Sequence, residues 1–555
     1  MSQRVASKDL ANDEEDTTSS SDEEDLYDEE EVLGFVLRSE RLPPEHQLRH
    51  DHVRSCVVAG IRRNLDFAKS RPVRKLCASK ADEFPMFARA RNARLIMSNK
   101  IPRMNSAESY PYCIWYPDLA TEQTYADLAK QYPAMRYQVG RACAVAGYNE
   151  LYKSLELLPD VSIAEEAQDN KTSGGEIFDL IMASPVKYAV MNDYERTINL
   201  ENPHAAYLNN DAAVRSKFDL RDPDEEGTLK GHWATMHWDI TEDWLRQDIN
   251  SRIEVDDPPL QPEYAHLLYS PLPLDLPPIN KDLLILTAAY EGNVDRYARL
   301  RRPHLIQDEA FCVIRGIHHS AAFARWWSGE LAQGLPERCG SGDHPSPYKI
   351  RNISMAINAR YIMSNDIARI SNAPKNHLPY MIWYPHRPHQ STLQEVVRVQ
   401  PEMKQAVAHA CIVCNYRRLW DKLRPDPHPV LYREAKQCAE PYYVADLEAR
   451  AKEQGIFLGG EMPRCHYPQA RALAQDKEPT STFLHGLAST RLIDTIGEAD
   501  FTRQIGFYGD GSLLSVTRGR VDLFICATEN ARAVAARQVG GWRMPLDWVE
   551  EEHDE

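Results

Sequence analysis

The sequence predicts a mostly α-helical protein that contains two copies of one helical domain and has an acidic segment at each end. Three observations predict this organisation: a long internal repeat, a short recurring pattern of small residues, and the concentration of net charge at the two termini. Alternation of polar and apolar residues, which would indicate strands, is scarce. The 555 residues are enough for more than one buried core.

The internal repeat is the strongest signal in the sequence. Residues 111–152 align without a gap with residues 379–420, and both segments begin with the element Pro-Tyr-x-Ile-Trp-Tyr-Pro. The offset between matching residues falls towards the N-terminus, which indicates small loop insertions within a duplicated domain. Two shorter upstream matches pair residues 92–99 with 358–365 and residues 56–61 with 312–317.

A shorter pattern recurs inside each half: two small residues are followed, after two further positions, by glycine or asparagine. A helix that packs closely against a neighbour needs small residues on its contact face, and glycine or asparagine tolerates the left-handed conformation in which helices often end. A second helix would then return antiparallel, so the pattern predicts stacked helix pairs. The pattern occurs at Cys56-Val57 with Gly60, Cys143-Ala144 with Gly147, Ala288-Ala289 with Gly292, Cys312-Val313 with Gly316, Cys411-Ile412 with Asn415, and Cys526-Ala527 with Asn530.

Three stretches carry a family resemblance. Residues 283–300 contain Ala-Ala-x-x-Gly and a closing leucine, residues 142–158 run from a small pair to Leu-Leu, and residues 482–488 read Thr-Phe-Leu-His-Gly-Leu-Ala. On these residues the chain resembles ankyrin-repeat proteins, and in particular the divergent ankyrin-like proteins of filamentous fungi. The resemblance implies an ankyrin-like helical solenoid whose concave surface binds other proteins.

Net charge is concentrated at the two ends of the chain. Residues 1–31 have a net charge of −11 and residues 546–555 one of −6, which together account for the formal charge of −17. Dense like charge with few apolar residues predicts disorder. Ser19, Ser20 and Ser21 precede an acidic run and are candidate phosphorylation sites; an unmodified, solvated run is the alternative.

Seven prolines between residues 255 and 278 predict a stiff, extended connector between the two halves. The predicted domains are an acidic disordered tail at 1–31, a first ankyrin-like half at 32–254, a Pro-rich connector at 255–278, a second half that duplicates the first at 279–545, and an acidic C-terminal tail at 546–555.

Composition also restricts the expected partners and compartment. The formally neutral body lacks the basic character of a nucleic-acid-binding protein or of a polybasic membrane-binding surface, and no apolar run reaches about 18 residues. We therefore expect protein partners, whose identity and stoichiometry the sequence does not specify, and neither nucleic acid nor membrane. The eleven cysteines and the absence of an apolar N-terminal segment predict reduced thiols and a cytoplasmic or nuclear location.

No catalytic, metal or cofactor motif is recognisable, so the sequence predicts no catalytic residue, no metal ligand and no cofactor. Cys411 and Cys414 form a single Cys-x-x-Cys, and Cys411 occupies a small-pair position, so we interpret it as a packing residue rather than as a metal ligand. The remaining candidates, His232 with His237, His318 with His319, His386 with His389, and the glycine-rich loop at 506–511, lack ligand spacing or a P-loop lysine.

The repeated Pro-Tyr-x-Ile-Trp-Tyr-Pro element supplies candidate partner-binding residues. Two interpretations remain open: the aromatic residues seal one helix pair against the next, which we favour, or they are exposed anchors for a partner. Two adjacent tryptophans on a helix cannot both face the core, so one member of a second pair is also a candidate. The candidate residues are Trp115, Tyr116, Trp383, Tyr384, Trp326 and Trp327.

Taken together, these features predict a non-enzymatic protein–protein interaction scaffold. One alternative is an enzyme or a small-ligand-binding protein with a site in the non-repeat segments 200–254 and 428–480. Another is an accessory or regulatory factor in fungal metabolism, which follows from the resemblance alone. The acidic tails could steer basic partners or compete for a basic site on the protein itself.

Overall fold

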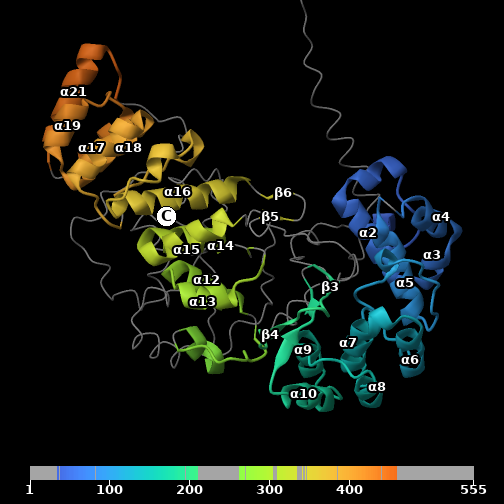
Figure 1. Ribbon diagram of the computed structural model, residues 1–555. Helices are drawn as coiled ribbons and strands as arrows, with labels where there is room; N and C mark the ends of the chain where they lie inside the picture. The colour runs from blue at the N-terminus through green and yellow to red at the C-terminus, as the bar shows by residue number, and fades with distance from the viewer. Residues whose placement is uncertain are drawn as a thin grey trace, which may run out of the picture. The chain divides into compact units, whose positions relative to one another are not determined.

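The structure is a computed structural model of the chain. It describes residues 34–209 and 262–458, except for 37, 82, 194, 269, 280, 304, 306–308, 334–339, 342–343, 346, 384 and 439. The described part is mostly helical, as the sequence predicts, and its strands are short (Figure 1). The two acidic tails, Ser19–Ser21, the glycine-rich loop and the Cys526 pattern lie outside the described residues.

Contacts divide the described chain into two compact units, of which the first ends at Leu157 and the second begins at Leu158. The predicted halves, by contrast, extend to residue 254 and start at residue 279, and those boundaries stay predictions. The first unit consists of η1 (Glu45–Arg49), α2 (Asp51–Arg63), α3 (Leu65–Lys69), α4 (Arg71–Ser79), α5 (Pro85–Met97), η2 (Ala107–Ser109), α6 (Glu122–Gln131), η3 (Pro133–Met135), α7 (Arg136–Ala146) and α8 (Asn149–Ser154).

The second unit begins with two helices and two short antiparallel strand pairs, β1 with β4 and β2 with β3, and continues with helices and a third pair, β5 with β6. Its elements are α9 (Val161–Asp169), α10 (Gly175–Met182), β1 (Lys187–Ala189), β2 (Met191–Asn192), β3 (Thr197–Ile198), β4 (His204–Ala206), η6 (Pro262–Leu268), α12 (Asp282–Glu291), α13 (Val294–Leu300), α14 (Glu309–His319), α15 (Ala321–Ala332), β5 (Gly340–Ser341), β6 (His344–Pro345), α16 (Pro347–Met363), η8 (Ile370–Asn372), η9 (Lys375–His377), α17 (Gln390–Val399), η10 (Pro401–Met403), α18 (Lys404–Cys414), α19 (Arg417–Leu423), α20 (Pro429–Gln437) and α21 (Tyr442–Gln454).

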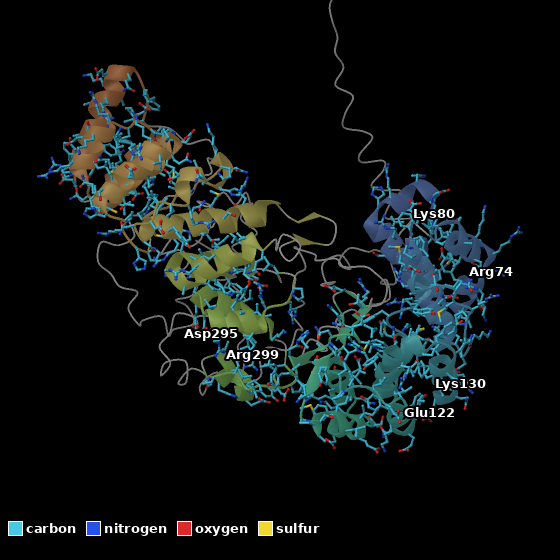
Figure 2. The ribbon with its side chains drawn as sticks, in the orientation of Figure 1. Arg74, Lys80, Glu122, Lys130, Asp295 and Arg299 are labelled. Carbon is cyan, nitrogen blue, oxygen red and sulfur yellow. The ribbon has the colours of Figure 1, made fainter. Side chains whose placement is uncertain are left out.

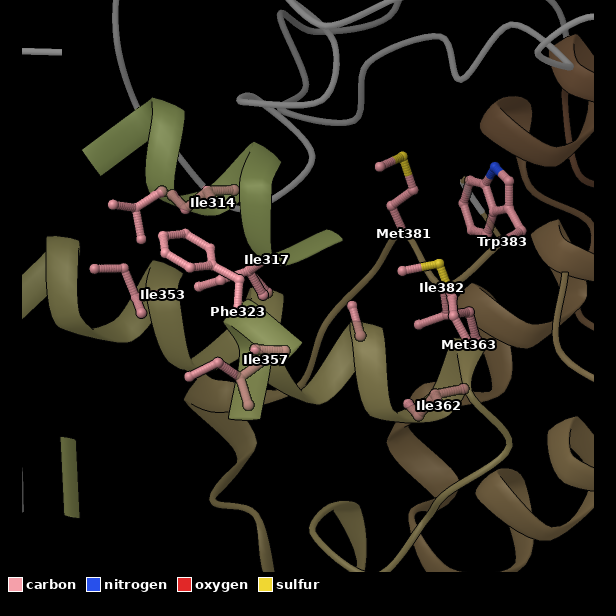
Figure 3. Packing of buried hydrophobic residues seen from close by; sticks show 14 of the residues in the cluster. Ile314, Ile317, Phe323, Ile353, Ile357, Ile362, Met363, Met381, Ile382 and Trp383 are labelled. Atoms are coloured by element: carbon pink, nitrogen blue, oxygen red, sulfur yellow. The ribbon is translucent and has the colours of Figure 1, made fainter. Parts of the chain in front are cut away.

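The helices of the second unit pack mainly against helices one or two positions away in chain order. Helix α14 contacts α12, α15 and α16, helix α18 contacts α17, α19 and α20, and α20 contacts α21. One hydrophobic cluster runs through all of these layers. In Figure 3, Phe323 of α15 lies among isoleucines of α14 and α16, and Trp383 lies further along the same cluster.

Left-handed helix ends occur at three of the predicted positions. Gly147, Gly292 and Asn415 have φ values of 76°, 66° and 55° and end α7, α12 and α18. At Gly60 and Gly316 the predicted helix end is wrong, because both glycines lie inside α2 and α14. There the glycine allows a close helix crossing instead: a Cβ at either position would collide with a backbone carbonyl oxygen, that of Val36 or that of Ala289.

The segments 111–152 and 379–420 contain the same order of elements, namely a helix, a 3₁₀ turn opened by proline, a second helix and a third. An asparagine upstream of each, Asn99 or Asn365, has a positive φ of 59° or 63°. Its side-chain oxygen accepts a hydrogen bond from the residue that precedes the first helix, Thr121 N or His389 N, each at 2.7 Å. The same local contacts therefore position the first helix in both segments.

The described part of the predicted connector packs against α12 and α13. Leu267, Leu268 and Leu276 are buried in the core of the second unit. Arg299, which Figure 2 labels, lies on α13. Its guanidinium donates to the carbonyl oxygens of Leu272 and Leu274 at 3.1 and 2.7 Å. From the prolines, the sequence predicts a stiff, extended connector in this region. The leucines between those prolines carry apolar side chains, and burying them in the core of the second unit is favourable.

Candidate partner-binding surface

The aromatic element of the first unit lies in the interior. Trp115 is 6% exposed, and the guanidinium of Arg141 lies 4.9 Å from the centre of its ring. The Tyr125 hydroxyl donates to the Ile114 carbonyl at 2.7 Å. Tyr116, next in the chain, is half-buried. Trp115 therefore packs beneath the surface, and the accessible aromatic area of this element belongs to Tyr116.

The equivalent element of the second unit surrounds a buried polar cluster. The ring of His409 stacks on Trp383 with a centroid distance of 4.4 Å, and its Nδ1 lies 3.0 Å from the Tyr380 hydroxyl. Its Nε2 lies 3.2 Å from a carboxylate oxygen of Glu434 in α20. Trp383, His409 and Glu434 are each at most 2% exposed. Tyr384 lies outside the described residues.

This Tyr380–His409–Glu434 cluster holds groups that take part in acid–base chemistry elsewhere, but here it holds α18 against α20. The side chains of His409 and Glu434 are buried beneath Trp383 and the surrounding core, whereas Tyr380 is half-buried. The cluster has no recognisable pattern in the sequence, since its members are 25 or more positions apart and form no motif. The signal that could have revealed it is an ionisable residue inside the small-residue helix, at His409.

The adjacent tryptophans of α15 differ in exposure. Trp327 is 2% exposed, whereas Trp326 is half-buried and reaches the surface. Trp326 stacks on Phe323 with an interplanar angle of 6°, and the Arg301 guanidinium lies 4.7 Å from its ring centre. Arg301 also forms an ion pair with Glu330. We call Trp326, Arg301 and Glu330 the Trp326 surface.

The composition of the Trp326 surface suits protein recognition. Tryptophan and arginine are the residue types most enriched among those that dominate binding energy at interfaces. Because Phe323 and Trp327 hold the indole from beneath, Trp326 would lose little conformational freedom on binding.

Thiols at and beside the small-pair positions have raised pKa values. Burial raises the pKa of Cys143 to about 12 and that of Cys414 to about 11, and it raises the pKa of Cys411 further. These thiols therefore stay protonated at neutral pH, whereas the thiolate is the nucleophile and the metal ligand. Within the described ranges, no group of three or more His, Cys, Asp or Glu side chains could hold a metal ion.

Asp160 is a second buried polar residue that sequence analysis did not identify. One carboxylate oxygen accepts from Ile163 N at 3.0 Å and caps α9, and the other accepts from Val190 N and Met191 N at 2.8 and 3.0 Å. It thereby ties the start of a helix to the strand region that follows. An aspartate just before an apolar helix was the available signal.

Comparison with known proteins gives one partial likeness. Residues 115–221 match the family model described as the YKP1 C-terminal domain, which is less than a quarter of the chain. No curated protein and no solved structure matches the chain. Of the helices in the described ranges, none has both the length and the apolar character needed to cross a membrane. The chain is thus similar to the YKP1 C-terminal domain over a segment that includes Trp115, Tyr116 and Asp160.

Proposed function

We propose that this protein is a non-enzymatic scaffold for protein–protein interaction, and that its two halves are tandem copies of an ankyrin-like helical solenoid domain. The observation that carries the proposal is the packing of consecutive helix pairs against their neighbours in chain order, in α12 to α16 and again in α17 to α21. Stacked pairs of this kind leave a long continuous surface, which repeat proteins use to bind partners.

Matching contacts at matching positions support the duplication. The Tyr148 hydroxyl donates to the Ala120 carbonyl at 3.1 Å, and the Tyr416 hydroxyl donates to the Pro388 carbonyl at 3.0 Å. The first bond joins the turn between α7 and α8 to the residues just before α6, and the second joins the turn between α18 and α19 to the residues just before α17. Such long-range pairs would recur together if the whole domain had been copied.

The non-enzymatic part of the proposal is supported by what the chemically capable side chains do. His409 and Glu434 are buried in a packing role, and the thiols of Cys143, Cys411 and Cys414 are held protonated. These groups stabilise the helix stack and are not presented to a substrate.

We expect the Trp326 surface to be the principal contact with a partner and Tyr116 to be a second. Trp327, whose ring contacts that of Trp326, would support it from beneath, and Trp115 and Trp383 would have packing roles, since little of each indole is exposed. Tyr384 keeps the role proposed for it from the sequence, as the second copy of Tyr116.

The test is to purify the full chain from its native cells, identify proteins bound in stoichiometric amount, and reconstitute each complex from purified components. Trp326→Ala should weaken binding by about tenfold to a hundredfold, the range for a central interface residue. Phe457→Ala is the matched control, because Phe457 is an aromatic residue that is 79% exposed and far along the chain.

Two results would contradict the proposal. One is a chain that has no reconstitutable protein partner but retains a small molecule in native mass spectrometry, which would favour a ligand site in 200–254 or 428–480. The other is a partner whose affinity is unaffected by substitution at both Trp326 and Tyr116, which would show that binding uses another surface.

A further inference from the structure

The formally neutral body of the chain contains a strongly basic stretch. Residues 34–110 contain 16 lysines and arginines and seven acidic residues, a net charge of +9. The remainder of the body is correspondingly acidic, so averaging over the whole body hides the basic part. These residues form η1 to η2 of the first unit and precede its aromatic element.

Five basic residues of this stretch are grouped on α4 and the two segments beside it. Arg71, Arg74 and Lys75 are exposed and have the i, i+3, i+4 spacing that places them on one helix face. Lys69 ends α3, and Lys100 follows α5. We call Lys69, Arg71, Arg74, Lys75 and Lys100 the basic face; Figure 2 labels Arg74 and, at its border, Lys80.

Charges on the basic face are largely uncompensated. Among the described residues, no ion pair engages Arg71, Arg74 or Lys75. The Lys100 ammonium lies close enough to Lys69 to lower the pKa of Lys69, an unfavourable like-charge contact that an anion would relieve.

Acidic residues lie at the edges of the basic face. Asp66 partly offsets Lys69, and Glu45 and Glu83 bind the neighbouring Lys80 at 2.8 and 2.9 Å. Lys75 also helps to lower the pKa of Glu45, so the charge of Lys75 is partly offset, whereas the arginines of α4 remain available.

The chain itself contains an anionic segment that can reach this face. Residues 1–31 have a net charge of −11, and the described chain starts three positions later at Gly34. Phe35 and Val36 belong to the same hydrophobic core as Val73 of α4, so the chain enters this unit through the core that α4 covers. The chain from Asp22 to Gly34 has twelve Cα–Cα steps and can span up to about 40 Å, more than the radius of a domain of this size.

We propose that the acidic segment 1–31 binds the basic face of its own chain and competes there with external polyanionic or acidic partners. Covalent attachment raises the effective concentration of the segment to about the millimolar range, so that even weak contacts would be occupied. Phosphorylation of Ser19, Ser20 or Ser21 would add charge and strengthen the contact.

Zero-length carbodiimide cross-linking of the full chain, followed by mass spectrometry, tests this proposal because it joins only carboxylates and lysines that touch. At about 50 mM salt we expect intrachain links from 1–31 to Lys69, Lys75 and Lys100, and a loss of about fivefold or more at 500 mM salt. Arg71→Glu with Arg74→Glu should reduce these links by a similar factor while leaving all three lysines in place.

The matched control is Lys130→Glu with Arg325→Glu, which makes the same charge change at two exposed positions outside the basic face and should leave the links unchanged. Three results would overturn the proposal: links spread over exposed lysines of both units, links insensitive to Arg71→Glu with Arg74→Glu, or links that occur only between two copies of the chain.

A second measurement does not depend on altering α4. It uses a variant in which the acidic residues from Asp22 to Glu31 are replaced by the corresponding amides, Asn and Gln. A short duplex DNA serves as the probe, a polyanion that can bind the basic face. If the segment covers the basic face, the variant should bind the probe about tenfold more tightly than the unaltered chain at low salt. Equal affinity for the two proteins would overturn the proposal. Neither outcome bears on the Trp326 surface.

Discussion

Residues 111–152 and 379–420 fold into the same elements, yet they fill the space around their shared tryptophan differently. In the first segment a guanidinium, that of Arg141, lies over Trp115. In the second, His409 occupies the matching position, stacks on Trp383 and faces Glu434. The two segments share their helix ends and turns. The polar residue that contacts the tryptophan differs between them, and in the second segment Glu434 faces the histidine that replaces the arginine.

The contacts that both segments share involve the backbone. Asn99 and Asn365 hold the same left-handed conformation and accept the same pair of hydrogen bonds, and Tyr148 and Tyr416 donate to equivalent carbonyls. A residue with positive φ, or a tyrosine hydroxyl that bonds a distant carbonyl oxygen, can be replaced by few other residues, whereas an apolar core tolerates exchange of side chains of similar volume. Four predictions test this distinction.

The largest effect is expected at the buried pair of the second segment. Glu434→Ala removes a side chain that is 2% exposed, together with the carboxylate that lies 3.2 Å from His409 Nε2, and the lost packing and lost contact should together cost about 3–5 kcal/mol. Glu453→Ala, on the exposed side of α21, is the control and should change stability by no more than about 0.5 kcal/mol. Hydrogen exchange of α18 and α20 amides would measure both. Equal effects would mean that the pair does not hold these helices together.

The helix crossings should be nearly as sensitive. Gly316→Ala and Gly60→Ala each place a methyl group against a backbone carbonyl, and each should destabilise its unit by about 3 kcal/mol. Gly329→Ala in α15 meets no atom within 4 Å and should stabilise that helix by about 0.5–1 kcal/mol. Urea unfolding of the three variants provides the comparison, and a tolerated alanine at only one crossing would show that the two crossings differ.

Smaller and equal effects are expected at the two asparagines. Asn99→Ala and Asn365→Ala should each cost about 1–2 kcal/mol, because each loses two hydrogen bonds and forces an alanine into a positive φ. Asn→Gly at either site removes only the hydrogen bonds and should cost less. Thermal unfolding would measure the four variants, and a difference above about 1 kcal/mol between the two sites would break the equivalence.

The smallest effect is a difference in pH response between the two units. Burial lowers the pKa of His319, His377, His386 and His428, and in the first unit the matching positions of the first three are Arg63, Ser109 and Asp118. A histidine whose folded pKa is depressed contributes stability above its unfolded pKa of about 6.5 and loses it as the pH falls below that value.

The second unit should therefore lose stability between about pH 7 and pH 5.5, while the first changes little. Amide hydrogen exchange at the two pH values, corrected for the intrinsic exchange rate, would measure this change. The opening equilibrium constant of amides in α14 to α20 should be about two- to tenfold larger at pH 5.5 than at pH 7. Exposed carboxylates with lowered pKa values, such as Glu45 and Glu395, titrate at lower pH and do not affect this window. A uniform response of both units would contradict the prediction.

Local features were well predicted from the sequence. The helical character and the left-handed ends at Gly147, Gly292 and Asn415 depend on φ, capping and spacing, which are set by residues a few positions apart. The same reasoning failed at Gly60 and Gly316, because a glycine can serve a helix end or a close crossing and only the neighbouring chain distinguishes the two.

The candidate site depended more on tertiary contacts. The pattern favoured burial of Trp115 and Trp383 but did not indicate which of Trp326 and Trp327 reaches the surface, since burial depends on which helices meet. His409 and Glu434 are far apart in the chain and become a pair only when α18 packs on α20.

By itself, the sequence determined where helices form, which positions repeat and where net charge lies along the chain, because these follow from composition and short-range geometry. Only the tertiary structure decided that connector leucines are buried, that Lys69 and Lys100 lie close together, and that burial raises the pKa of the Cys143 thiol. The physical reason is that burial, like-charge proximity and ion pairing depend on distances between residues that the chain brings together only by folding.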